Sequence, residues 1–362
     1  MSGSAPGVQY VGCRIEVGMP APLRGLGMAP AAWYGTGGLN MAPIGRIGLE
    51  KRVITILGCT AVGKGTLARA IAGRLGAEIV SIDSMKVYRG MDIGTAKPSA
   101  EARAAIPHHL IDVAEPWEPF SVARFIELAD AAVGEVHGRG RPVIAVGGTL
   151  LYFKCFYQGL FAGPSADPAI RAEIRRRAEV EGIEALHAEL ARIDPEAAGR
   201  IHRNDLRRIE RALEVHRLTG TPISVLQREW DSQSIRRPEW DWVLIGLRRP
   251  REVNNRRINE RVRRMVAAGL VEEARRLWAD PRGLSDQARQ AVGYAELFEH
   301  FEGRMSLDEA IERIKINTRH LAKQQRTWLR RLERVNWIDV EEADDLERIV
   351  GLVLPLACGT GS

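Results

Sequence analysis

The feature that most constrains the fold of this 362-residue chain is a glycine-rich turn between a strand-like run and a helix-like run. Residues 53–57 are mostly β-branched, and apolar residues recur at helical spacing from Lys64 to Leu75. The turn between them reads GCTAVGK over residues 58–64. In such a turn, backbone N–H groups and the helix N-terminus converge on a phosphate, and the lysine adds a positive charge. The sequence therefore favours a phosphate-binding P-loop over a glycine-rich turn with a purely structural role.

We expect the phosphate cradle to comprise Gly58, Cys59, Thr60, Ala61, Val62, Gly63, Lys64, Gly65 and Thr66. One position departs from the usual motif, because the residue after Lys64 normally carries a hydroxyl that binds magnesium. Here that residue is Gly65, and Thr66 follows it. The order Gly-Lys-Gly-Thr also resembles the nucleoside monophosphate kinases. A small-molecule kinase is therefore an open alternative at this point.

Three further strand-like runs, at residues 78–83, 143–146 and 242–247, alternate with helical segments. This alternation predicts an α/β fold, with a parallel sheet of the P-loop NTPase type covered by helices. No strand candidate lies between 165 and 238, and the region from 250 to 331 is helical and rich in arginine. The expected organisation is a disordered extension (1–50), the first part of the core (51–164), an inserted helical subdomain (165–238), the second part of the core with basic helices (239–340) and a C-terminal tail (341–362).

Composition narrows the cellular setting. The formal net charge of +6 and the pI near 9.3 fit a polyanionic partner. The four cysteines form no C-x-x-C pair, which argues against a disulfide framework or a structural zinc. No apolar run is long enough for a bilayer, and the N-terminus lacks the layout of a secretory signal. We therefore expect a cytoplasmic protein that has no membrane association.

Asp83 and Thr149 each follow a strand-like run, so both should emerge at the carboxyl edge of the sheet, beside the P-loop. A carboxylate there acts as a general base, caps a helix or binds magnesium, and position alone leaves these roles open. Thr149 either satisfies a local backbone group or hydrogen bonds to a ligand. His108 and His109 have no nearby Cys or carboxylate set that completes a metal site, so we interpret them as structural.

Several longer segments resemble one family, the bacterial-type tRNA dimethylallyltransferases (tRNA isopentenyltransferases). The motifs are DSMKVYRGMDIGTAKP at 83–98, GGTLLY at 147–152, SADP at 165–168 followed by Arg171, VGY at 292–294 and WLR at 328–330. The resemblance covers about residues 53–338. The chain departs from the family at Cys59, Val62 and Gly65, where Pro, Ser and Thr or Ser are common, and at Lys86, where many members have Gln.

The resemblance implies a prenyltransferase that moves a dimethylallyl group from dimethylallyl diphosphate to N6 of an adenosine in tRNA. The target is the adenosine 3′-adjacent to the anticodon (position 37), in tRNAs that read codons starting with U. The implied catalytic residues are Asp83 as general base, Thr149 and Lys64. Arg251 and Arg257 match arginines near the diphosphate, and Mg²⁺ would bind through Thr66 or Asp83. The implied partner is the anticodon stem-loop, bound by a monomer.

Basic residues recur along three helical segments with few acidic partners four residues away. A charged stripe is usually a solvated face, but uncompensated repulsion favours an external polyanion. With the resemblance, the expected tRNA-binding residues are Asp83, Ser84, Met85, Lys86, Thr149, Arg171, Arg207, Arg208, Arg211, Lys323, Arg326 and Arg330.

Three alternatives remain. A kinase would use the same cradle. A prenyltransferase acting on free adenine nucleotides would have little use for the basic helices. A P-loop RNA-binding protein that has lost catalysis is the non-enzymatic alternative, and the intact Lys64 and Asp83 argue against it.

Overall fold

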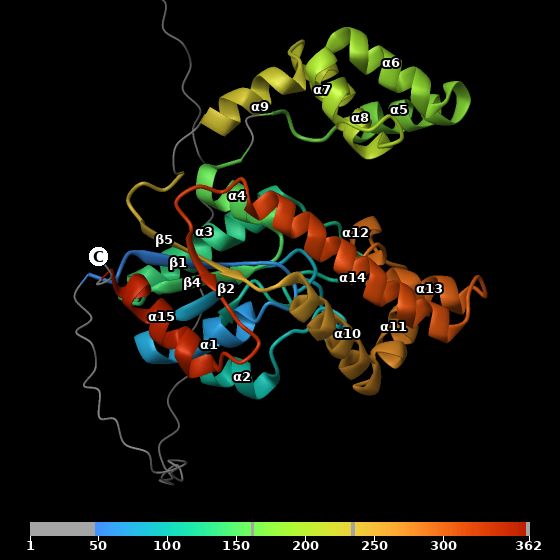
Figure 1. The fold of residues 1–362 in the computed structure, drawn as a ribbon. Coiled ribbons are helices and arrows are strands. Elements are labelled where there is room, and N and C mark those ends of the chain that lie inside the picture. The colour runs from blue at the N-terminus through green and yellow to red at the C-terminus, as the bar shows by residue number, and fades with distance from the viewer. Residues whose placement is uncertain (1–47, 161–162, 233–235, 360–362) are drawn as a thin grey trace, which may run out of the picture. The chain divides into compact units, whose positions relative to one another are not determined.

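Six parallel strands form a single sheet in the order β3-β2-β4-β1-β5-β6 (Figure 1). This is a computed structural model, and it describes residues 48–160, 163–232 and 236–359. Residues 1–47, most of the extension expected to be disordered, lie outside the described part. The strands are β1 (Arg52–Leu57), β2 (Glu78–Ile82), β3 (His108–His109), β4 (Val143–Gly147), β5 (Asp241–Arg248) and β6 (Asn336–Asp339). The predicted α/β class is confirmed.

Fifteen helices accompany the strands within the described residues. They are α1 (Lys64–Leu75), α2 (Ala100–Ala105), α3 (Val122–Gly138), α4 (Leu150–Gln158), α5 (Pro168–Glu181), α6 (Ile183–Ile193), α7 (Pro195–Arg200), α8 (Leu206–Thr219), α9 (Ile223–Ser232), α10 (Arg251–Ala267), α11 (Leu270–Trp278), α12 (Asp286–Arg289), α13 (Tyr294–Phe301), α14 (Leu307–Leu329) and α15 (Leu346–Cys358). In this part of the chain, no helix combines the length and apolarity needed to cross a membrane.

Alternate residues of each central strand enter two different cores, one on each face of the sheet. In β1, Ile54 and Ile56 pack in a cluster with residues of α1 and α15. Val53 and Leu57 pack in the other, with residues of α3 and α4. Figure 1 shows these two helix pairs on opposite faces. Helices on both faces explain why the strands are nearly continuous apolar runs.

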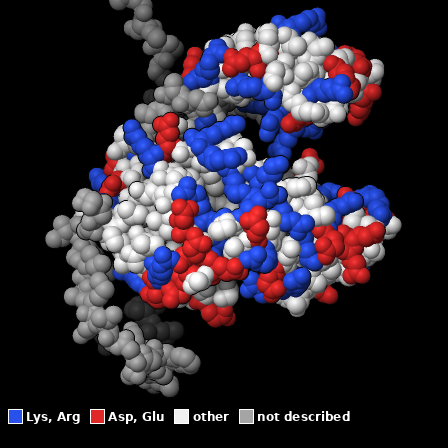
Figure 2. Space-filling view, in the orientation of Figure 1, with Lys and Arg blue, Asp and Glu red and all other residues white. Residues whose placement is uncertain are grey.

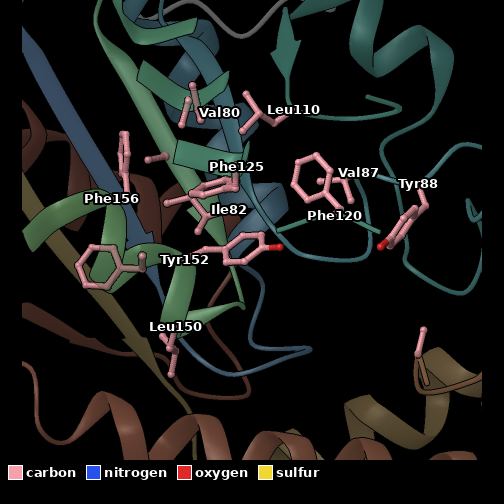
Figure 3. Close-up of a cluster of buried hydrophobic side chains, with 14 of the residues drawn as sticks. Val80, Ile82, Val87, Tyr88, Leu110, Phe120, Phe125, Leu150, Tyr152 and Phe156 are labelled. Carbon is pink, nitrogen blue, oxygen red and sulfur yellow. The ribbon is translucent and has the colours of Figure 1, made fainter. Parts of the chain in front are cut away.

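The second of these cores fixes the strand ends that matter for the site. Phe125 of α3 stacks on Tyr152 of α4 with ring centroids 4.4 Å apart. Figure 3 shows both rings grouped with Ile82, the last residue of β2. This packing holds the start of α4 and the end of β2 in place, so the loops that follow β2 and β4 lie on a rigid base.

Helices α5–α9 connect β4 to β5 and have an apolar core of their own, which includes Ile174, Leu186, Leu190 and Leu213. The SADP motif begins this unit. The Asp167 side chain accepts hydrogen bonds from the backbone N–H groups of Ala169 and Ile170, so it caps α5.

The C-terminal segment contains elements that the sequence analysis did not assign. Strand β6 pairs with β5 at the edge of the sheet, although it has only four residues. Residues 341–362, expected only as a tail, include α15, which packs in the same core as α1. Arg52 Nη1 donates a hydrogen bond of 2.8 Å to the carbonyl oxygen of Ala357 in this helix.

Candidate active site

The loop between β1 and α1 has the geometry of an anion cradle. Gly58, Ala61 and Gly63 have positive φ angles of 147°, 64° and 113°. A Cβ at Gly58 would lie 2.9 Å from the carbonyl oxygen of Leu247, so the close approach to β5 requires glycine. No side chain caps the N-terminus of α1, which begins at Lys64. Its first N–H groups are therefore available to a phosphate.

Side chains from α1, from α10 and from the loop between β5 and α10 donate hydrogen bonds to the carbonyl oxygens of the P-loop. The hydrogen bonds are Lys64 Nζ to Cys59 O (2.8 Å), Asn254 Nδ2 to Thr60 O (3.3 Å), Arg257 Nε to Ala61 O (3.0 Å) and Arg249 Nε to Val62 O (3.3 Å). Because the carbonyl groups are tied down, the loop conformation is fixed before any ligand arrives.

Positive charge gathers at the mouth of the cradle. Burial lowers the pKa of Lys64 to about 8, and the nearby guanidinium of Arg261 also lowers it. Burial likewise lowers the pKa of Arg261, whereas Asp83 favours its charged form. Within the described residues, the Arg261 guanidinium has no hydrogen-bond partner, although it lines the same cleft as Lys64. Its five N–H donors are therefore free for an anionic ligand.

The ends of β2 and β4 lie next to the P-loop along the same end of the sheet, and they line the same cleft. Asp83 Oδ1 accepts hydrogen bonds from Met85 N (2.9 Å) and Lys86 N (3.3 Å), as a cap does. Its Oδ2 makes no hydrogen bond within the described part of the chain. Thr149 Oγ1 accepts from Ser84 N at 2.9 Å and donates to Ser84 Oγ at 3.1 Å. The carboxylate thus combines a structural oxygen with a free one.

The Gly-Gly-Thr motif is explained by how closely these strand ends approach each other. A Cβ at Gly147 would lie 1.7 Å from the carbonyl oxygen of Ile82, and one at Gly148 would lie 2.7 Å from Gln325 Nε2. Thr149 N donates to the same Ile82 oxygen at 3.3 Å. Only glycine allows β4 to deliver Thr149 beside Ser84 at this spacing.

Comparison with known proteins places the chain in one family. A family model described as IPP transferase matches residues 86–332. The chain belongs to the IPP transferase family. It is 48% identical to a tRNA dimethylallyltransferase of Geobacillus thermodenitrificans over 298 residues, which is 82% of this chain and 93% of that protein. The resemblance that the sequence motifs indicated is confirmed.

Solved structures agree with this assignment. The chain is similar to the full-length tRNA isopentenylpyrophosphate transferase of Bacillus halodurans, with a TM-score of 0.61 and 41% identity over 86% of this chain and 98% of that one. It is also similar to a eukaryotic dimethylallyltransferase acting on tRNA, with a TM-score of 0.69 and 25% identity over 86% of this chain and 80% of the other.

Many residues expected to form the site line a single cleft. They are Thr60, Ala61, Gly63, Lys64, Gly65, Thr66, Asp83, Ser84, Met85, Lys86, Thr149, Arg208, Arg211, Arg257 and Lys323. The remaining P-loop residues Gly58, Cys59 and Val62 lie behind the cleft wall, and Cys59 and Val62 are buried. Arg251 and Arg326 line a separate small hollow, which also contains Lys323. Arg326 additionally approaches Cys59 Sγ at 3.9 Å.

Figure 2 shows Lys and Arg gathered in a band across the middle of the view, near α10 and α14. The basic residues of these two helices that line the cleft include Arg256, Arg257, Arg264 and Lys323. Arg330 is exposed just after α14, beside this surface. The structure thus brings the basic stripe of α10, and Lys323 of α14, to the cleft that holds the P-loop.

The basic stripe of α8 has an acidic partner, at a spacing of three residues rather than four. The partner is Glu214 of α8, which is fully buried. Its carboxylate accepts hydrogen bonds from Arg171 Nε (to Oε1, 2.8 Å) and from Arg211 Nη1 (to Oε2, 2.6 Å). These arginines hold the pKa of Glu214 below its usual range against the opposing effect of burial. Arg171 of α5 therefore has a structural partner, while Arg207 and Arg208 of α8 remain exposed.

Two residues of the site were not among those expected from the sequence. Arg261 is one, although its spacing of four from Arg257 puts both on one helix face. Gln325, on a mostly apolar face of α14, is the other. It is buried, with Oε1 2.7 Å from Thr60 N and Nε2 2.8 Å from Gly148 O. A lone amide in an apolar stripe was the signal that could have identified it.

The side chains of the cleft also fit a magnesium ion that is held mainly by the phosphate oxygens of a bound ligand. No group of three or more His, Cys, Asp or Glu side chains arranged for a metal occurs among the described residues. Mg²⁺ usually needs only one or two protein ligands when phosphate oxygens supply others. Thr66 is exposed at the start of α1, and both it and Asp83 line the cleft.

Proposed function

We propose that this protein is a tRNA dimethylallyltransferase. It transfers the dimethylallyl group of dimethylallyl diphosphate to N6 of the adenosine at position 37, next to the anticodon of tRNAs that read codons starting with U. The observation that carries the proposal is the P-loop cradle opening onto the same cleft as Asp83 and Thr149. The relatives named tRNA dimethylallyltransferase support the choice of reaction.

The cradle side receives the leaving group. When the allylic C–O bond breaks, its electrons leave with the diphosphate, and negative charge builds on the leaving oxygen. Lys64, the N–H groups at the start of α1 and the guanidinium groups of Arg257 and Arg261 face the position where this charge develops. Thr66 or Asp83 would hold a magnesium ion at this position, and the ion would supply further neutralising charge.

Asp83 serves the acceptor. The exocyclic amine of adenine is a poor nucleophile, because its lone pair is delocalised into the ring. As the new C–N bond forms, one amine proton must leave, and the free Oδ2 of Asp83 accepts it. Thr149 orients the base by redirecting the hydrogen bond that it donates to Ser84 Oγ toward the adenine, while it keeps the bond that it accepts from Ser84 N.

The basic surface holds the tRNA. A base inside a folded anticodon loop is reached by extrusion into a pocket, and the phosphates around it carry the affinity. Lys323 of α14 and Arg208 of α8 line the cleft, and Arg326 and Arg330 lie further along α14 and just after it. We propose that a cytoplasmic monomer binds the anticodon stem-loop through this surface.

The test is a transfer assay with defined substrates. The protein is incubated with labelled dimethylallyl diphosphate, magnesium and unmodified tRNA, and the nucleosides are then analysed by mass after digestion. Prenylated adenosine at position 37 is expected, with none when the tRNA carries guanosine there. Transfer to free adenine nucleotides at a similar rate would show that these nucleotides, and not tRNA, are the acceptor. ATP-dependent phosphorylation without prenyl transfer would establish the kinase instead.

A further inference from the structure

Gln325 of α14 connects two segments that line the cleft, the P-loop and the turn after β4. Its Oε1 accepts a hydrogen bond from the backbone N–H of Thr60 in the P-loop, and its Nε2 donates to the carbonyl oxygen of Gly148 after β4. The residue is only 7% exposed, and it lines the cleft together with Thr60 and Gly148. Gly148 leaves the room that the amide fills, since a Cβ there would lie 2.7 Å from Nε2.

The contacts continue beyond Gly148 without a gap. Thr149 is the next residue, its hydroxyl binds Ser84, and Ser84 follows Asp83 in the chain. One hydrogen-bonded path therefore runs from the loop that holds the diphosphate to the carboxylate that receives the proton. Gln325 is the only side chain in the described residues that bonds to both the P-loop and the Gly-Gly-Thr segment.

We infer that Gln325 is a positioning residue. The two hydrogen bonds of its side-chain amide set the separation between the P-loop, which binds the donor, and the segment of Gly148 and Thr149, which faces the acceptor. The inference rests on the proposed transfer reaction. A transfer between two bound molecules depends steeply on the distance between the reacting atoms, and a displacement of about 1 Å can cost a hundred-fold in rate. The bond to Thr60 leaves the later N–H groups of the loop and of α1 to face the diphosphate.

A purely structural role would predict a different pattern. A buried amide that only satisfies two backbone groups stabilises the fold, and its removal lowers stability without a separate effect on the transfer step. The positioning role predicts that the transfer rate falls while the affinity for each substrate is largely kept. The two roles are therefore separated by measuring rate, affinity and stability in the same variants.

The main variant is Gln325→Met, which keeps the length of the side chain but makes neither bond. The matched control is Asn317→Leu on the same helix. It removes the hydrogen bond that Asn317 Nδ2 donates to Glu296 Oε1 (2.7 Å). Neither of these two residues lines the cleft. Single-turnover transfer at saturating substrates is measured below the melting temperature of both variants. The affinity of the P-loop cradle is measured by calorimetry, with inorganic diphosphate as the ligand.

We expect Gln325→Met to transfer about ten- to a hundred-fold more slowly than wild type. Its diphosphate affinity should change by only a few-fold, and Asn317→Leu should transfer at the wild-type rate. A Gln325→Met enzyme that transfers as fast as wild type, or as fast as the control, overturns the inference. Failure of the wild type to transfer would instead refute the proposed function itself, so the two failures are distinguishable.

Gln325→Glu adds a signature that packing alone would not give. A protonated Glu can replace Gln, because its O–H donates to Gly148 O and its C=O accepts from Thr60 N. The ionised form has no donor for Gly148. The transfer rate of this variant relative to wild type should therefore rise as the pH falls. A ratio that does not depend on pH would contradict the bridging role of the two bonds.

Discussion

Asp83→Asn separates the roles that a carboxylate in this position can play. The structure shows that Oδ1 holds the N–H groups of Met85 and Lys86, while Oδ2 is free. Asn keeps an oxygen for the first task and caps about as well as Asp. It cannot take a proton at neutral pH. The substitution therefore removes the proposed base and leaves the turn intact.

The size of each effect follows from these contacts. Loss of a general base costs about a hundred- to ten-thousand-fold in rate. The free energy of unfolding should change by well under the roughly 0.5–2 kcal/mol that loss of a cap costs. Asp83→Ala loses both capping bonds as well as the base, so it should show the rate defect together with that loss of stability.

The assay is the single-turnover rate of transfer at saturating tRNA, measured at low and high magnesium. Affinity for tRNA should change little, because the phosphate contacts lie elsewhere. Partial rescue by high magnesium would identify Asp83 as a metal ligand. A wild-type rate in Asp83→Asn would refute the general-base role and leave the carboxylate as a cap alone.

Three further predictions test other parts of the site. Lys64→Ala should lower the transfer rate a hundred-fold or more, because one lost charge facing a developing anion costs about 2.7–4 kcal/mol. Since burial lowers the pKa of Lys64 to about 8, its amine loses its charge as the pH rises through that value. Calorimetry should show diphosphate affinity falling there in wild type but not in Lys64→Ala. The double variant Arg326→Ala with Arg330→Ala should lower the slope of log tRNA affinity against log salt concentration. The expected decrease is roughly one unit or less per lost phosphate contact. An unchanged slope would show that these two arginines do not contact the tRNA. Gly147→Ala should reduce the free energy of unfolding by at least about 1–3 kcal/mol in urea titrations, because its Cβ would meet a carbonyl oxygen of β2 at 1.7 Å. Gly134→Ala in α3, where a Cβ meets nothing within 4 Å, is the control that should lose no stability.

The parts of the fold that the sequence predicted are those whose cause lies within a few neighbouring residues. Strand β1, the glycine turn and α1 form one continuous pattern, and α1 begins and ends where the apolar periodicity does. The strand ends at Asp83 and Thr149 were placed at one edge because parallel strands share their direction. Strand β6 was not predicted, since four residues with polar ends give too short a pattern and its pairing with β5 is non-local.

The same distinction explains the site. Gln325 could not be assigned a role from its own helix, because both of its partners come from loops more than 170 residues away in the chain. Arg171 looked free in the sequence, since its partner Glu214 lies 43 residues further along, on α8. Charge patterning along one helix detects partners three or four residues away but misses those that tertiary packing supplies.

The hydrogen bond from Arg52 to the carbonyl oxygen of Ala357 has a practical consequence for handling the protein. It joins the start of β1 to the last turn of α15, at the edge of the sheet opposite the P-loop. Residues near both ends of the described core therefore lie on the side away from the cleft. A surface tether or fluorescent label attached at the exposed Glu50 or Lys51 would leave the cleft open to a macromolecule as large as tRNA, which suits single-molecule measurements of docking and release.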